Sequence, residues 1–161
     1  MKLLWACSFG LTELAIQLIT RDGTSRTTKT SNGWTPLLEI LRSINDIQHP
    51  YSKMPEHARG EVPKLVAFAK MLIDDKRIDI NGTVVDEVLW LGRDRDWDDF
   101  AVGHSALSLC MQGNDRYNPH LVRHILKSPN LTIDGITLLT LIKFRFFDLF
   151  NNLLSQCVIA C

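Results

Sequence analysis

A short phrase occurs three times along this chain of 161 residues, and its recurrence constrains the fold more than any single residue does. It reads NGWTPL at 32–37, GHSAL at 103–107 and GITLL at 135–139. Each copy opens an apolar segment with helical spacing, and a second apolar helical segment follows. The segment LLWACSFG at 3–10 looks like the same unit without its first few residues. Such self-similarity predicts a stack of repeated units, and it moves the question of function from a catalytic pocket to a binding surface.

Four repeated units account for the whole chain, 1–161, as a single domain. The predicted units are 1–31, 32–81, 82–134 and 135–161. In each unit a short helix, a turn and a second helix carry more apolar surface than one pair can bury alone, so neighbouring pairs must stack. The sequence therefore predicts an all-α fold, a solenoid of helical hairpins whose Leu, Ile and Phe stripes form one continuous core.

Polar residues mark where several of these helices begin. Thr35-Pro36 and Asn118-Pro119 each place a capping side chain before a proline, which needs no backbone donor at the first helical position. Thr12 is predicted to cap the second helix of the first unit. The predicted apolar face of that helix comprises Leu14, Ala15, Ile16, Leu18 and Ile19.

The repeated unit resembles the ankyrin repeat, whose pattern is Gly-x-Thr-Pro-Leu-His, a short helix, a turn, a second helix and an Asp-Val-Asn-like step. The second unit carries most of this pattern, with its first helix in 33–43, its second in 63–74 and its step at 78–81. The family's histidine is replaced in the four units by Leu4, Leu38, Ser108 and Thr140. The resemblance implies stacked hairpins with loop fingers and a non-catalytic protein-binding module.

Two insertions depart from a plain repeat, at 44–62 between the helices of unit two and at 82–102 in the next finger. The second insertion has six acidic and two basic residues, a local charge of four negative (6 − 2), interleaved with Trp90, Trp97 and Phe100. Tryptophan is favoured as an interface anchor because one rigid side chain buries much area. We expect this acidic-aromatic finger either to contact a protein partner with a basic surface or to fold back on the stack as a lid.

The residues predicted to contact that partner lie on the concave side of the stack. Trp34 occupies the variable position between Gly33 and Thr35, where the family resemblance implies a contact residue. The basic finger between units one and two and the acidic-aromatic finger supply the other candidates, which are Arg26, Lys29, Trp90, Arg93, Asp94, Asp96, Trp97, Asp98 and Asp99.

Composition excludes several classes of function. Lysines and arginines total 18 and so do aspartates and glutamates, so the chain lacks the basic excess typical of nucleic-acid binding. No apolar run approaches the roughly 20 residues of a membrane span. Cys7 and Cys110 are predicted to be buried small residues rather than halves of disulfides. We therefore expect a monomer in a reducing compartment. This is the cytoplasm, or the host cytosol or nucleus if the chain is one of the bacterial effectors or viral ankyrin proteins that its irregular repeats resemble.

Catalytic and metal chemistry find little support. His120 and His124 share a helix face, but Leu121 stands where a metalloprotease helix needs glutamate. The run 94–99 lacks the glycine of a calcium loop. The sequence therefore predicts no catalytic residue, no metal and no cofactor. The open alternative is a recruitment domain of a larger enzyme or secreted effector whose chemistry lies elsewhere.

Overall fold

The computed structural model describes residues 2–21, 27–48, 60–84, 105–111 and 118–132, with shorter stretches between 138 and 151. These residues form no β-strand and six α-helices: α1 (Lys2–Ser8), α2 (Thr12–Arg21), α3 (Pro36–Gln48), α5 (Val62–Asp74), α6 (Ala106–Met111) and α7 (Pro119–Leu126). The all-α prediction is confirmed over this part of the chain.

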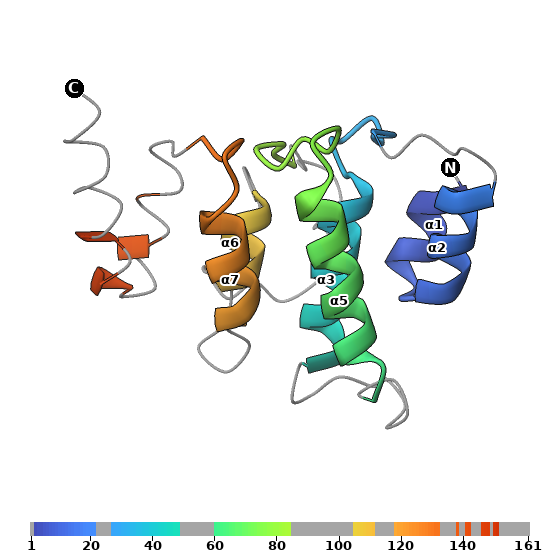
Figure 1. Cartoon of the computed structure of the whole chain (residues 1–161), viewed down its shortest axis with the longest axis horizontal. Helices are drawn as coiled ribbons and strands as arrows, with labels where there is room; N and C mark the ends of the chain where they lie inside the picture. Colours follow the sequence, from blue (N-terminus) through green and yellow to red (C-terminus); the bar gives the residue numbers. More distant parts are fainter. Residues whose placement is uncertain are drawn as a thin grey trace, which may run out of the picture.

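The helices stand in two parallel rows (Figure 1). The pairs α1–α2, α3–α5 and α6–α7 are in contact as hairpins. Helices α1, α3 and α6 contact one another in sequence as one row, and α2, α5 and α7 do so as the other. We call these the inner row and the outer row. The three hairpins therefore stack side by side along the long axis of the molecule.

The recurring phrase starts the first helix of units two and three in the same way. The Thr35 hydroxyl accepts a hydrogen bond from the backbone N–H of Leu38 at 3.3 Å. The Ser105 hydroxyl accepts one from the N–H of Ser108 at 3.2 Å. At the outer helix α7, the Asn118 side chain accepts one from Leu121 at 3.1 Å. The helix starts predicted at Thr35-Pro36 and Asn118-Pro119 are confirmed.

The predicted cap at Thr12 is wrong by one residue. The carbonyl of Leu11 accepts the first helical hydrogen bond, from the N–H of Ala15 at 2.9 Å, so Leu11 occupies the capping position. The Thr12 hydroxyl instead donates to the carbonyl of Gly10 at 3.3 Å. It therefore closes the α1–α2 turn, in which Gly10 has φ +66°.

Two further sequence expectations need correction. Leu14 and Ile16 are exposed rather than buried. Leu14 lines an open groove beside α5, and Ile16 faces the side of the hairpin that no described helix contacts. Helix α3 continues through 44–48 into the predicted insertion at 44–62. It stays helical there because Ile44 and Ile47 still face the core.

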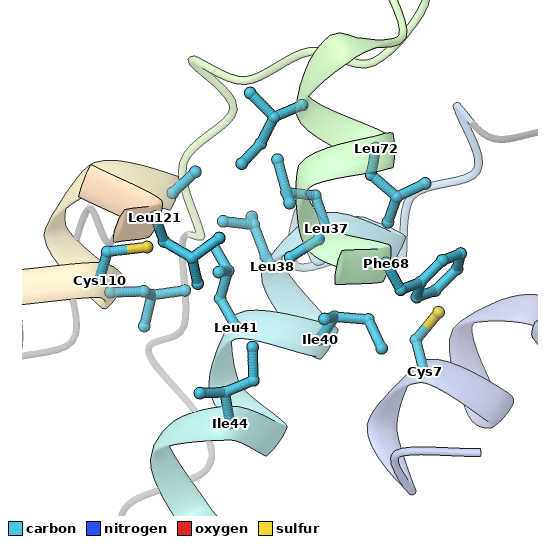
Figure 2. Packing of buried hydrophobic residues seen from close by; sticks show 14 of the residues in the cluster. Cys7, Leu37, Leu38, Ile40, Leu41, Ile44, Phe68, Leu72, Cys110 and Leu121 are labelled. Carbon is cyan, nitrogen blue, oxygen red and sulfur yellow. The ribbon is translucent and has the colours of Figure 1, made fainter. Parts of the chain in front are cut away.

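The inner helix α3 lies at the centre of the core (Figure 2). Its apolar side chains are almost completely buried, namely Leu37, Leu38, Ile40, Leu41, Ile44 and Ile47. Cys7 and Cys110 are buried free cysteines in the neighbouring inner helices, as predicted. Burial, with a smaller contribution from the Glu39 carboxylate, raises the pKa of the Cys7 thiol to about 12. Burial also raises the pKa of Cys110, so both thiols stay protonated and pack as apolar groups.

Polar side chains of α3 bind the main chain of both inner-row neighbours. The Ser43 hydroxyl donates to the carbonyl of Cys7 on α1 at 2.9 Å. The Asn45 side-chain amide donates to the carbonyl of Leu109 on α6 at 2.8 Å. Both bonds are buried, and they fix the register of three successive helices.

The steps that follow the outer helices are joined in the same manner. Asn81 donates from its side chain to the carbonyl of Asn130 at 2.7 Å and accepts from the N–H of Thr132 at 2.7 Å. The ammonium of Lys29 lies 2.9 Å from a carboxylate oxygen of Asp79. Equivalent parts of successive units are therefore hydrogen-bonded or ion-paired to one another, as a repeating stack requires.

Gly33 holds the turn that places Trp34 at the start of α3. Its φ is +88°, in the left-handed region, and a Cβ atom there would lie 2.6 Å from the carbonyl oxygen of Thr83. Both the backbone conformation and the close approach require glycine.

We expect Gly33→Ala to destabilise the protein by more than about 1–2 kcal/mol, the cost of the left-handed conformation alone. The matched control is Gly60→Ala, because a Cβ atom there meets nothing within 4 Å. Urea unfolding of the two variants measures the difference. Equal stabilities would show that the turn does not constrain residue 33.

Candidate functional site

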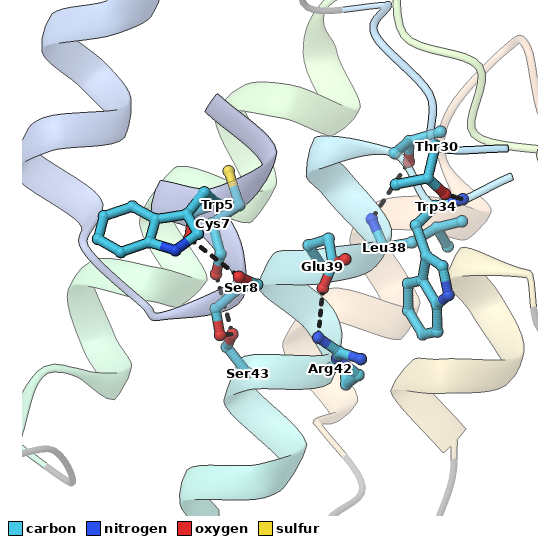
Figure 3. Close-up of polar contacts among 10 residues, drawn as sticks. Trp5, Cys7, Ser8, Thr30, Trp34, Leu38, Glu39, Arg42 and Ser43 are labelled. Carbon is cyan, nitrogen blue, oxygen red and sulfur yellow. Dashed lines mark hydrogen bonds and ion pairs between the residues drawn. The ribbon is translucent and has the colours of Figure 1, made fainter. Parts of the chain in front are cut away.

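The most distinctive side chains on the inner row are an arginine and a tryptophan in contact. The guanidinium carbon of Arg42 lies 4.7 Å from the centroid of a Trp34 ring (Figure 3). The Arg42 side chain remains 39% exposed, and Trp34 is partly buried against the core. An arginine stacked on an indole gains a cation–π interaction and loses rotamer freedom before any partner arrives.

Glu39 forms an ion pair with Arg42 on the same helix. Its carboxylate lies 2.7 Å from the Arg42 guanidinium, yet its side chain is only 9% exposed. The oxygen that faces Arg42 is buried and makes no hydrogen bond of good geometry with any described residue. Burial raises the pKa of Glu39 because the loss of water outweighs the attraction of Arg42, and the charge of Asp46 adds to the rise. We call Trp34, Glu39 and Arg42 the Trp34–Arg42 cluster.

Local structure explains why these residues meet. A turn whose hydrogen bonds join Thr30 to Trp34 places the indole directly before the Thr35 cap. Glu39 and Arg42 are three residues apart on α3 and therefore share one helix face. The cluster lies on the side of α3 that faces the viewer in Figure 3, where the Trp5 ring on α1 points away from α3.

A groove of about 620 Å³ lies elsewhere, between the α1–α2 turn and the start of α5. Its apolar lining comes from Phe9, Leu11, Leu14 and Ile47. Its charged lining comes from Glu13, Glu61 and Lys64. The Lys64 ammonium lies 2.9 Å from Glu61 and 4.0 Å from Glu13, so the charges at the groove are already engaged with each other.

The structure describes two of the residues predicted to contact a partner. Trp34 belongs to the cluster above. Lys29 forms the ion pair with Asp79, which lowers the pKa of that aspartate, chiefly through the hydrogen bond from the lysine. The others lie outside the described residues, and their role stays a prediction: Arg26, Trp90, Arg93, Asp94, Asp96, Trp97, Asp98 and Asp99.

Sequence reasoning did not find Glu39 and Arg42. Two signals were present in the chain. An acid lies three residues before a base, and the acid interrupts the apolar run Leu37–Leu41, where a charge is expected to be buried.

Groups that could carry chemistry are scattered in the described part of the chain. His124 lies 2.8 Å from Asp74 and joins α7 to α5. No set of three or more His, Cys, Asp or Glu residues in the described ranges is grouped to hold a metal ion. None of the described helices combines the length and the apolar character that crossing a bilayer needs.

Comparison with known proteins gave no match: no family model, no curated protein and no solved structure resembles this chain significantly.

The raised pKa of the buried Glu39 predicts how the stability of the protein changes with pH. Its pKa is raised in the folded state, so the unfolded chain loses this proton first as the pH rises, and folding then becomes less favourable. Relative to Glu39→Gln, which has no proton to lose, the wild-type chain should therefore lose unfolding free energy as the pH is raised above the ordinary carboxyl pKa of 4.5. Urea unfolding of both proteins at a series of pH values measures the effect. A constant difference, or one that favours the wild type as the pH rises, contradicts it.

Proposed function

We propose that the chain is a divergent ankyrin-type stack that binds a protein partner through its inner row and adjoining fingers, with no catalysis of its own. Three features support an ankyrin-type stack. The hairpins form two rows, the recurring phrase caps inner helices in two units, and the Asn81 step is bonded to the 130–132 step. A stack of this kind offers a continuous surface along one row of helices.

The observation that carries the proposal is the Trp34–Arg42 cluster. Tryptophan and arginine dominate the binding energy of protein interfaces. Here the arginine is already stacked on the indole and anchored to a buried carboxylate, so little side-chain entropy remains to be lost on binding. The remaining guanidinium donors can bind carbonyl or carboxylate oxygens of a partner.

The acidic-aromatic finger at 82–102 is proposed as a second contact, for a basic region of the same partner. This part of the proposal rests on its sequence alone, with four net negative charges beside two tryptophans. Of this finger the structure describes 82–84, and Val84 is completely buried. We propose the cytoplasm as the compartment, since buried free thiols suit a reducing environment.

Affinity capture from a cytosolic lysate tests the cluster. A protein that is enriched by the wild-type chain should be lost with Trp34→Ala and with Arg42→Ala. Loss of a hot spot costs about 2 kcal/mol or more, a fall in affinity of roughly 30-fold when the captured protein is purified and titrated. The control is Met71→Ala, which truncates an exposed side chain on the outer row. Equal capture by all four chains would contradict a role for the inner row.

A second arm separates the cluster from the finger. In this chain 85–100 is replaced by a Gly-Asn turn, which keeps the buried Val84, and its circular dichroism and melting must match the wild type. Under the proposal this chain binds more weakly than the wild type while Trp34→Ala weakens binding further. Unchanged binding by the shortened chain would remove the finger from the site.

A further inference from the structure

The first hairpin exposes an unusual number of large apolar side chains. Five of the eight exposed large apolar residues in the described part of the chain lie between residues 5 and 16: Trp5, Phe9, Leu11, Leu14 and Ile16. The Trp5 and Phe9 rings pack on each other with centroids 4.9 Å apart. A solenoid normally ends in a unit with a polar outer face, and a large exposed apolar patch marks an interaction surface.

Two of these residues lie on the free end of the stack. Trp5, 55% exposed, points away from α3, the one described inner helix that α1 contacts (Figure 3). Leu14 lines the groove beside Lys64 of α5. Ile16, 37% exposed, follows two residues later, about 200° around the helix, and so faces away from α5. We call Trp5 and Ile16 the N-terminal end face.

The opposite end of the stack also exposes apolar groups. The segment around 138–151 lies beyond α6 and α7 in Figure 1. Leu141, Phe146 and Phe150 pack against the core. Their neighbours Ile142 and Phe147 are 44% and 54% exposed, so their side chains turn away from the core. We call Ile142 and Phe147 the C-terminal end face.

We propose that a second copy of this chain docks head to tail, with its C-terminal end face on the N-terminal end face of the first. Within the described part of the chain, each junction between hairpins joins two different faces through apolar side chains of one core. One face lies on the C-terminal side of a hairpin, and the other lies on the N-terminal side of the next. Head-to-tail docking continues this interface across two molecules. A head-to-tail contact leaves one end face unpaired at each end of a dimer, so further copies can add to it.

The proposal departs from the monomer expected from the sequence and goes beyond the proposed function. The inner row stays open in such an array, which repeats the Trp34–Arg42 cluster at intervals. A partner with several binding sites would then be held by avidity rather than by one contact.

Sedimentation velocity on the purified chain, with no partner present, tests the proposal independently of the proposed function. The wild type should gain mass with concentration and pass beyond a dimer. Trp5→Glu blocks one end and Phe147→Glu the other, so each variant alone should stay a monomer. Their equimolar mixture should form a dimer that grows no further, because one unblocked end remains on each chain.

Three results would overturn the proposal. The first is a wild type that stays monomeric at its solubility limit, and the second is a mixture of the two variants that forms no dimer. The third is self-association of Phe147→Glu alone, because that result indicates two N-terminal end faces packed together. Met71→Glu on the outer row is the charge control and should assemble like the wild type. All variants are checked for helical content, and Ile16→Glu and Ile142→Glu replace any blocking variant that fails to fold.

Discussion

Burial of α3 between two inner-row neighbours and its hairpin partner is the constraint on which the rest of the structure depends. A helix with neighbours on three sides must bury most of its residues, and ten of the thirteen residues of α3 are buried. Its buried Ser43 and Asn45 side chains donate hydrogen bonds to carbonyl groups of α1 and α6. An unsatisfied buried carbonyl costs about 1–3 kcal/mol, so these bonds select one register of the stack. Apolar contact alone would tolerate several registers.

The same packing decides which surfaces remain for function. Helices α1, α5 and α6 contact α3, and its remaining side carries Glu39 and Arg42 beside Trp34, together with the exposed Asp46. Large apolar groups remain exposed mainly on the first hairpin and among the described residues between 138 and 151, besides Met71 on α5. The binding surface proposed along the row and the assembly surfaces proposed at its ends would both follow from one linear architecture.

The sequence was a good guide wherever one local rule decides the outcome. The caps at Thr35 and Asn118 follow from side-chain hydrogen bonding near a proline, and the burial of Cys7 and Cys110 follows from their place in the repeat. The sequence was a poor guide where contacts with residues distant in the chain decide whether a side chain is buried. Leu14 and Ile16 share the helical period of the core, but Leu14 borders a groove and Ile16 faces away from α5, where no described helix covers it. The spacing of Glu39 and Arg42 signals an ion pair, but the position of Arg42 over Trp34 depends on a turn that this spacing does not reveal.

Native-state hydrogen exchange tests most directly whether the stack is organised around α3. In a linear stack the central unit has neighbours on both sides and the end units have one, so local unfolding begins at the ends. Amides of α3 and α5 should exchange most slowly, with faster exchange in α1 and α2 on one side and in α7 on the other. Amides of α1 or α7 that are protected as strongly as those of α3 would contradict this organisation, and with it the structural basis of both proposed surfaces.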